Sequence, residues 1–458
     1  MVNMYNKNNN KLKSLRNILL ASTAFGSLFA ESAFAVNRLA INNMSRISQP
    51  VHWIGGVAPV AGDNLIFTGF DTINFDGNIN INNINLYGFD GNTIEINHDC
   101  SIHNITNDIS PAARALVQAA NGGVAVPAGL GINAKSIISF ETNHKSLTIT
   151  GNDLRGVGNI ILKHNNNSLI FDSAIIVDAM IYSGGNLWST VIANKNVTFN
   201  NKIGDDPING AKSIFRLDID QNSSVTIKND IRASEITLLT NNSELIVDPS
   251  LNNIRVFSGI NFFEATGENE GKINIKGHAA NTVTITGQIG DVDLRLSKIT
   301  IENGKSTAFD QAVFAKKIEI AQNTVIFNDN VNMVNAANGD RGTLEFTGNG
   351  TIEIADNKSI RGNIKTAANH TGNISFKGIS AVEQIGELNA RVAKATTNNG
   401  AIAFNQAIYA DRFDVSGNGM VTINHRRLSA DQVLLNHAKC THSFCQWLRC
   451  TSNYSRGK

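Results

Sequence analysis

Proline, cysteine, aromatic side chains and charge are all scarce in this chain of 458 residues. It holds 6 prolines and 4 cysteines, and only 17% of its residues are charged. Hydrophobic residues make up 42%, a composition that excludes an intrinsically disordered chain. The few cysteines exclude a disulfide framework as the main source of stability. We therefore expect a chain that folds by burying apolar side chains and pairing its backbone.

Neither basic nor acidic residues are clustered in the body of the sequence. The formal net charge is +1, and basic residues are concentrated in residues 1–16 and 425–458. The body between these segments is mildly acidic and has no basic stripe. Nucleic acid is therefore not an expected partner.

Glycine, asparagine, serine and threonine are abundant instead. Asn, Ser and Thr side chains compete for backbone hydrogen bonds and so disfavour helices. Glycine, with 38 copies, and asparagine accept the positive φ that tight turns need. The composition favours short β-strands joined by turns.

The first 35 residues have the organisation of a secretory signal peptide. An apolar run at 18–30 is shorter than the roughly 20 residues that a membrane span needs, and Ala33-Phe34-Ala35 provides a small–x–small cleavage site. We place the cleavage between Ala35 and Val36. A cytosolic amphipathic helix would leave this site unexplained, so we expect the protein to be exported. The basic residues that precede the apolar run are Lys7, Lys11, Lys13 and Arg16.

Short stretches with strict apolar and polar alternation fill residues 40–424, separated by Gly-Asn, Asn-Gly, Asp-Gly or Asn-Asn. The alternation is typical of half-buried strands and the gaps are typical of turns. Segment 288–318 recurs 96 residues later as 384–413, and segment 227–236 is a weaker copy. This long repeat helps to choose among the all-β folds. Stacked coils produce such repeats. We predict an all-β fold, a parallel β-helix or β-solenoid of stacked short strands.

Two segments interrupt this pattern. Residues 107–135 form an Ala/Gly-rich insertion, in which Ser110 and Pro111 predict one short helix at 110–120, with an irregular loop as the alternative. Residues 425–458 form a basic, cysteine-containing tail without alternation, either a cap or partner-binding segment or a frameshift product. The predicted organisation is signal peptide 1–35, solenoid start 36–106, insertion 107–135, solenoid 136–424 and tail 425–458.

The repeated units share Gln-Ile-Gly, then an arginine, a glycine and Gln-Ala-Val/Ile-Phe/Tyr-Ala. These units, at 288–318 and 384–413, resemble passenger repeats of rickettsial outer membrane proteins A and B, the surface cell antigen autotransporters. The opening at 52–67, His-Trp-Ile-Gly-Gly followed by Gly-Asp-Asn-Leu-Ile-Phe, resembles autotransporter passenger starts. The resemblance covers roughly residues 45–424.

This resemblance implies a parallel β-helix that a C-terminal β-barrel exports to the surface of a Gram-negative bacterium, where it contacts host cells. The chain departs from the family because no alternating strands of about ten residues, as a barrel needs, follow residue 424. We therefore expect a truncated or frameshifted relative that lacks the C-terminal β-barrel.

Paired carboxylates are the strongest catalytic candidates in the sequence. Such pairs suit glycoside cleavage or calcium binding, but Asp is also common in turns and on exposed strand faces. We favour the second interpretation, because a fold does not confer a site. Carboxylates that converge from neighbouring coils would favour the first. The pairs are Asp205-Asp206, Asp218 with Asp220, and Asp291 with Asp293.

Other residue patterns predict no catalytic, cofactor or metal site. His98 and His103 flank Cys100, but no further ligand accompanies them. Cys440, His442, Cys445 and Cys450 have a spacing that fits no standard zinc site. The motifs of serine hydrolases, P-loops and zinc proteases are absent from the sequence.

The expected function is that of a non-enzymatic, cell-surface autotransporter passenger with a role in host-cell adhesion or in a surface layer. Its partner would be a host-cell surface protein or glycan. Outer-membrane association would need a barrel supplied elsewhere; otherwise the exported chain would stay in the periplasm or reach the cell surface. The alternatives are a β-helix enzyme that cleaves polysaccharides and a non-functional, truncated remnant of an autotransporter gene.

Overall fold

The computed structural model describes most of the region between residues 58 and 435. The predicted cleavage site between Ala35 and Val36, the predicted helix at 110–120 and most of the tail lie outside the described residues. The described ranges are 37–39, 58–68, 72–87, 93–106, 136–155, 157–184, 188–204, 213–220, 222–240, 242–262, 270–335, 339–378, 380–398, 402–416, 421–423, 428–435 and 455–456.

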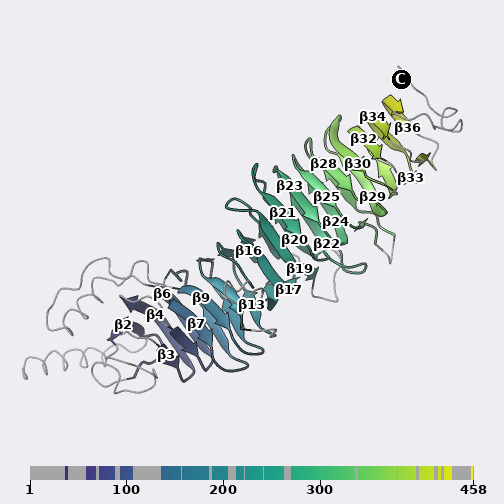
Figure 1. Ribbon diagram of the computed structural model, residues 1–458. Helices are drawn as coiled ribbons and strands as arrows, with labels where there is room; N and C mark the ends of the chain where they lie inside the picture. Colours follow the sequence, from purple (N-terminus) through teal and green to yellow (C-terminus); the bar gives the residue numbers. More distant parts are fainter. Residues whose placement is uncertain are drawn as a thin grey trace, which may run out of the picture.

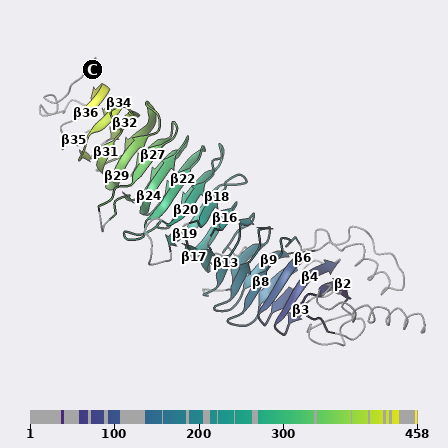
Figure 2. The ribbon, with the colours of Figure 1, turned by 180° about the vertical axis from the view of Figure 1, so that it is seen from behind.

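The chain forms a parallel β-solenoid of about 13 turns, and its described part contains no helix. This confirms the fold class predicted from the sequence. The turns are stacked along one long axis, from the N-terminal strands at one end to the C-terminal strands at the other (Figure 1). The view from behind shows the same elongated stack (Figure 2). All pairings between named strands are parallel.

Each turn has three faces, which we call A, B and C in chain order, and each face is a ladder of paired strands from successive turns. Face A contains β3 (Thr72–Phe75), β5 (Thr93–Ile96), β7 (Ser136–Phe140), β9 (Val157–Leu162), β12 (Met180–Ser183), β21 (Thr282–Ile285), β23 (Ser306–Phe309), β25 (Thr324–Phe327), β28 (Thr351–Ile354), β30 (Thr371–Phe376) and β32 (Val392–Asn398).

Faces B and C are built in the same way. Face B contains β8 (Ser146–Ile149), β10 (Ser168–Phe171), β13 (Thr190–Ala193), β15 (Ile214–Ile219), β26 (Val331–Asn332), β33 (Ile402–Phe404) and β35 (Val421–Ile423). Face C contains β1 (Asn37–Leu39), β2 (Asn64–Thr68), β11 (Ile175–Val177), β14 (Val197–Phe199), β16 (Ser224–Ile227), β18 (Glu244–Val247), β20 (Glu270–Ile275), β22 (Leu296–Ile301) and β27 (Thr343–Phe346).

Longer strands bend around a corner and contribute to two faces. In β24, for example, Val313 pairs on face B and Ile318 on face C. The corner-spanning strands are β4 (Ile79–Tyr87), β6 (Cys100–Thr106), β17 (Ile231–Leu238), β19 (Ile254–Phe262), β24 (Val313–Ile320), β29 (Lys358–Thr366), β31 (Ser380–Ile385), β34 (Ile408–Ser416) and β36 (Leu428–Leu435), and β37 (Ser455–Arg456) pairs with β36.

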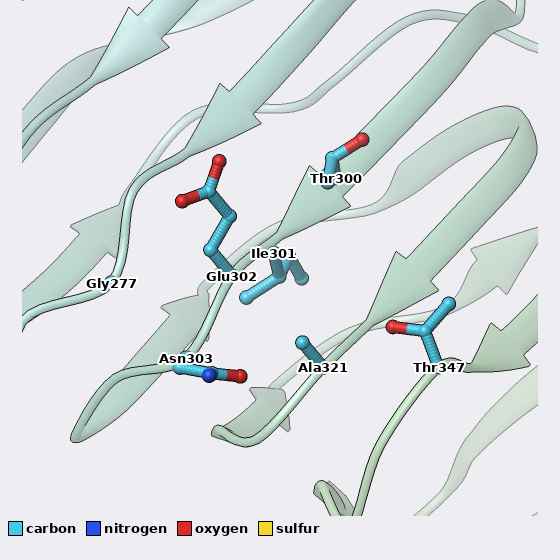
Figure 3. A pocket seen from close by; sticks show the side chains of 7 residues that line it. All are labelled: Gly277, Thr300, Ile301, Glu302, Asn303, Ala321 and Thr347. Carbon is cyan, nitrogen blue, oxygen red and sulfur yellow. The ribbon is translucent and has the colours of Figure 1, made fainter.

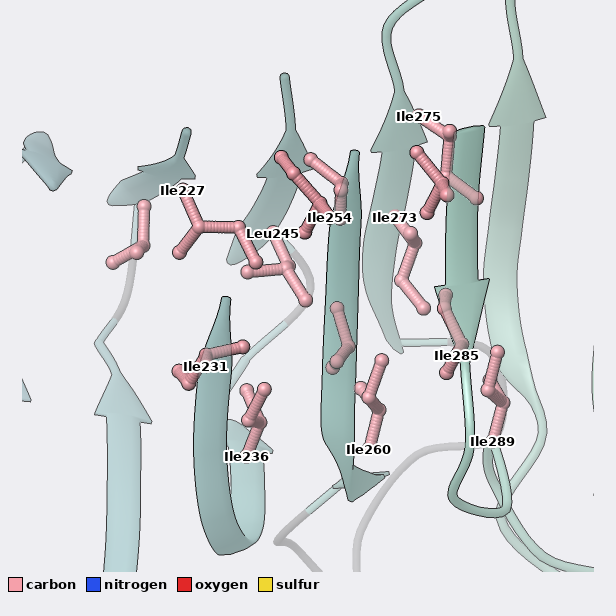
Figure 4. Packing of buried hydrophobic residues seen from close by; sticks show 14 of the residues in the cluster. Ile227, Ile231, Ile236, Leu245, Ile254, Ile260, Ile273, Ile275, Ile285 and Ile289 are labelled. Carbon is pink, nitrogen blue, oxygen red and sulfur yellow. The ribbon is translucent and has the colours of Figure 1, made fainter. Parts of the chain in front are cut away.

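Alternation along each strand builds the core. In the strand at Thr351–Ile354, the two isoleucines are buried and Thr351 and Glu353 face outward, because successive side chains of a strand point to opposite faces. The inward Ile, Leu, Val and Phe side chains of all three faces form one core cluster, and Figure 4 shows isoleucine and leucine side chains of several turns packed within it. Full burial of such a side chain stabilises the fold by about 1.5–3 kcal/mol. The core is therefore one continuous column.

The insertion at 107–135 leaves the stack uninterrupted. Strand β5 pairs directly with β7, and β6 pairs with β8, so the turns on either side of the insertion are in contact. Elsewhere, register partners in adjacent turns are 18 (Thr307 and Val325) to 29 (Ile254 and Val283) residues apart. The turns therefore tolerate corners of variable length without losing register.

The solenoid continues beyond the boundary expected at residue 424. Strand β36, at Leu428–Leu435, pairs with β34 over seven residue pairs and buries Ala430 and Val433 in the core. The sequence expectation was wrong here because the short Leu-Ser-Ala-Asp-Gln-Val stretch alternates only weakly. The start of the tail is part of the fold.

Candidate functional site

The two copies of the Gln-Ile-Gly motif form corners of the same shape. Gln288 Nε2 donates to the carbonyl oxygen of Gly290 (2.8 Å), and Gln384 Nε2 donates to that of Gly386 (3.0 Å). Both glycines have positive φ, 65° and 66°, a conformation that favours glycine. The motif thus encodes a tight corner between two faces.

The arginine of each copy ties its corner to later turns. Arg295 is fully buried, and its Nη1 donates to the carbonyl oxygen of Met333. Arg391 donates through Nη2 to the carbonyl oxygen of Ala410 (2.9 Å) and through Nη1 to Asp431 Oδ1 (2.7 Å). These hydrogen bonds satisfy backbone groups and a carboxylate in the stack. Both arginines therefore have a structural role.

The two corners lie on different edges of the solenoid. Ile289 pairs with Ile260 and Val313 on face B, whereas Ile385 pairs with Ile364 on face C. The 96-residue repeat is therefore not a whole number of turns, and the second copy is displaced by one face. The repeats do not combine into a single binding surface.

The carboxylates considered for catalysis are in different environments. Asp218 is buried beside Arg216, whose Nε lies 2.7 Å from Asp218 Oδ1. Burial raises the pKa of Asp218 and outweighs the opposing charge of Arg216. Asp291 and Asp293 are exposed and lie in the corner loop, not on a strand as the sequence spacing suggested.

The two carboxylate pairs do not converge. Register partners step from Asp218 to Thr237 and Asn261, and Ile260 pairs with Ile289 just before Asp291. Three turns at about 4.8 Å each give a separation of roughly 14 Å, beyond the roughly 5–9 Å that glycoside hydrolysis uses. Asp205 and Asp206 lie outside the described residues.

The outer surface of face C has a row of alternating charges. Lys298 Nζ and Lys317 Nζ both lie 2.7 Å from Glu319, and Lys317 also lies 2.7 Å from Glu345. Burial alone would raise the pKa of Glu319, but the hydrogen bonds and charges of the two lysines outweigh it and lower the pKa. The charges are paired within the row, so it stabilises the stack rather than presenting one sign of charge to a ligand.

A shallow depression of about 390 Å³ lies at the corner that follows face C (Figure 3). Glu302 on its wall binds Lys276 Nζ (2.6 Å), and Asn303 Oδ1 accepts the backbone N–H of Gln322 (2.9 Å). Of its two threonine hydroxyls, that of Thr347 donates through Oγ1 to the carbonyl oxygen of Ile320 (3.3 Å). Glu302, Asn303 and Thr347 therefore already have partners within the stack.

In the described part of the chain, histidine and cysteine are not gathered into a metal site. Burial raises the pKa of the Cys100 thiol to about 12, so it stays protonated and packs in the core with Ile102. Among the residues that the structure describes, no group of three or more His, Cys, Asp or Glu could hold a metal ion. The tail cysteines lie outside these residues.

One surface feature was missed by sequence reasoning. Trp188 is exposed and packs against Phe215, with ring centroids 4.5 Å apart. A signal was present in the sequence, because Trp188 follows Gly-Gly-Asn-Leu and stands outside the alternating pattern. The pair lies at the corner between faces A and B.

Comparisons with protein-family models, with curated proteins and with solved structures give no match. In the described part of the chain, no helix is long and apolar enough to cross a membrane. The β-solenoid fold is therefore the firm basis for any statement about function.

Proposed function

We propose that this chain is an exported, non-enzymatic β-solenoid passenger that acts in adhesion or in a surface layer of a Gram-negative bacterium. The partner is a molecule of the host-cell surface, a protein or a glycan. The observation that carries the proposal is the elongated stack itself, with three outer faces that continue over about 13 turns. Extended repeat surfaces suit many weak contacts made in parallel.

Two features of the described residues support this proposal over catalysis. The candidate pair at Asp218 is separated from the pair at Asp291 by three turns. The charged side chains in the row of Lys298, Lys317, Glu319 and Glu345 on face C are paired with one another. The signal-peptide organisation of residues 1–35 and the resemblance of segments 288–318 and 384–413 to autotransporter passengers point to the cell surface. An extended rod of about 13 turns fits that location.

Export is tested by expressing the full chain in a Gram-negative host and identifying the N-terminus of the mature product by mass spectrometry. We expect cleavage between Ala35 and Val36. Ala35→Asp, which places a charged side chain at the small-residue position, should leave the precursor uncleaved. Ala35→Ser keeps a small side chain and serves as the matched control. A wild-type product that retains residues 1–35 would contradict export.

Surface display and adhesion need separate measurements. Protease treatment of intact cells should release peptides from the solenoid, and the purified mature chain should bind cultured host cells saturably. Export without accessible peptides would restrict the protein to the periplasm. Accessible peptides without cell binding would favour a surface layer over adhesion.

A further inference from the structure

The strongest unexplained feature of the described surface is the aromatic pair of Trp188 and Phe215. Trp188 is 61% exposed, although burial of so large an apolar side chain would be favourable. Its ring plane is tilted by 31° from that of Phe215, with the centroids 4.5 Å apart. Phe215 belongs to the following turn and covers one side of the indole. Most of the remaining surface of Trp188 is open to solvent.

Polar side chains continue the row on the other side of Trp188. The backbone N–H of Asn166, one turn earlier, donates to the carbonyl oxygen of Trp188 (3.0 Å). Asn166 Nδ2 lies 3.3 Å from His144 Nδ1, one turn earlier again. His144 and Asn166 are both exposed and have positive φ, 55° and 57°. One exposed side chain per turn therefore forms a straight row, with a step of about 4.8 Å.

Two neighbouring columns of face B carry uncharged side chains. Ser146, Ser168 and Thr190 are register partners on its outer surface, and Thr148, Ile170 and Ile192 form the adjacent column. Lys145 lies between His144 and Ser146 in the chain, and further charged groups stand at the margins of the two columns. Asp99 accepts hydrogen bonds from the backbone and hydroxyl of Ser146 (2.8 and 3.1 Å), and Arg216 is paired with Asp218.

We propose that the row formed by His144, Asn166 and Trp188 binds a neutral oligosaccharide. A pyranose ring has an apolar C–H face and a rim of hydroxyl groups. The open side of Trp188 fits the C–H face, and the amide of Asn166 and the imidazole of His144 can hydrogen-bond the hydroxyls. The step between turns is close to the length of one sugar ring, so successive rings meet successive turns.

The hydroxyl and apolar side chains of these two columns favour a neutral ligand. An acidic glycan or a charged peptide would find no unpaired counter-charge on Ser146, Ser168 or Thr190, whose side chains are hydroxyls. The inference names a ligand class for the proposed surface role and rests on that role for its biological meaning. The binding itself can be measured on purified chain, independently of export.

The test is calorimetric titration of the purified full chain with cellohexaose and maltohexaose, with hexagalacturonate as the acidic probe. We expect saturable binding of a neutral hexasaccharide and weaker binding of hexagalacturonate. Trp188→Ala should weaken the neutral binding roughly tenfold, and Trp188→Phe should weaken it less. Leu251→Ala removes another exposed apolar side chain, 58% exposed, and should leave binding unchanged. Matching thermal unfolding of all variants shows that the fold is intact.

Two outcomes would overturn the proposal. One is that neither neutral hexasaccharide binds, or that Trp188→Ala binds as tightly as the wild type. The other is that sedimentation shows a wild-type dimer and a monomeric Trp188→Ala variant, which would make the aromatic pair a contact between copies of the chain. Either result leaves the export experiment unaffected, so the failure of the two proposals can be told apart.

Discussion

Asparagine has a structural role in this solenoid that its abundance alone does not reveal. Asn83 Nδ2 donates to Asn64 Oδ1 (2.7 Å), and Asn104 Nδ2 donates to Asn83 Oδ1 (2.8 Å). Asn104 Oδ1 in turn accepts the backbone N–H groups of Asn152 and Asp153, both at 3.0 Å. Each side-chain amide carries a hydrogen-bond donor and an acceptor, so the amides of a stacked column bind one another from turn to turn. Such columns compensate for the scarcity of charge.

Glycine at the Gln-Ile-Gly corner is required by two independent constraints. Gly290 has φ +65°, and a Cβ added there would lie 2.6 Å from the carbonyl oxygen of Phe314. We expect Gly290→Ala to lower the free energy of unfolding by about 2 kcal/mol, measured by denaturant unfolding. Gly77→Ala is the matched control, since a Cβ there meets nothing within 4 Å. Equal effects at the two positions would contradict this account of the motif.

The ion pairs of Glu319 with two lysines predict that the stability of the fold depends on pH. Folding lowers the pKa of Glu319. The carboxylate of Glu319 therefore contributes fully to the free energy of unfolding at pH values above its unfolded pKa of about 4.3. This contribution is lost as the pH falls through the folded pKa. We expect Glu319→Gln to lower the stability at pH 7 by about 1 kcal/mol and to have a smaller effect at pH 3. Melting temperatures of both proteins between these pH values test this. A difference in melting temperature between the two proteins that is the same at pH 3 and at pH 7 would contradict this prediction.

At the scale of strands, the sequence predicts what periodicity encodes. Alternation identified segments such as 351–354 and 343–346, and both are strands with the expected inward and outward side chains. The burial of alternate residues leaves a period of two in any single sequence. Alternation cannot reveal which strands are partners, because three equivalent faces accept the same pattern. This is why the displacement of the repeat by one face emerged only from the register of Ile289 and Ile385.

The candidate sites were less predictable than the fold. The spacing of Asp291 and Asp293 suggested one strand face, but the pair lies in a corner loop, because a glycine with positive φ directly precedes it. Trp188 stands outside the alternating pattern, but its exposure depends on how successive turns stack at the corner. The local sequence does not encode that stacking.

Stacked phenylalanines in adjacent turns predict coupling between strands. The rings of Phe309 and Phe327 are parallel to within 12°, with centroids 5.3 Å apart. We expect Phe309→Leu and Phe327→Leu to show a coupling free energy of about 0.5–1.5 kcal/mol in a double-mutant cycle by denaturant unfolding. A cycle of Phe309→Leu with Phe75→Leu, in a distant turn, should be additive. Additivity in both cycles would exclude a specific ring contact.

At the scale of the whole molecule, the described strands of each turn pair only with strands of neighbouring turns. The pairings run from turn to turn without long-range closure, so stability should be a sum of turn and interface contributions. A destabilising substitution should then favour unfolding of its own turn and the adjacent turns, whereas a globular domain unfolds as a unit. The uninterrupted pairing of β5 with β7 and of β6 with β8 across residues 107–135 is consistent with this modular construction.

Hydrogen exchange on a core variant tests this modularity. Ile352 is fully buried on β28 and is the register partner of Val325 and Ile374, so Ile352→Ala should remove about 2–5 kcal/mol of local stability. We expect faster amide exchange in β25, β28 and β30 and unchanged exchange in β8 and β10, many turns away. Thr351→Ala, on the outer surface of the same strand, is the matched control and should change neither group. If exchange accelerated equally from one end of the stack to the other, the turns would form a single cooperative unit. The modular construction would then be wrong, because a change in one turn would affect all the others.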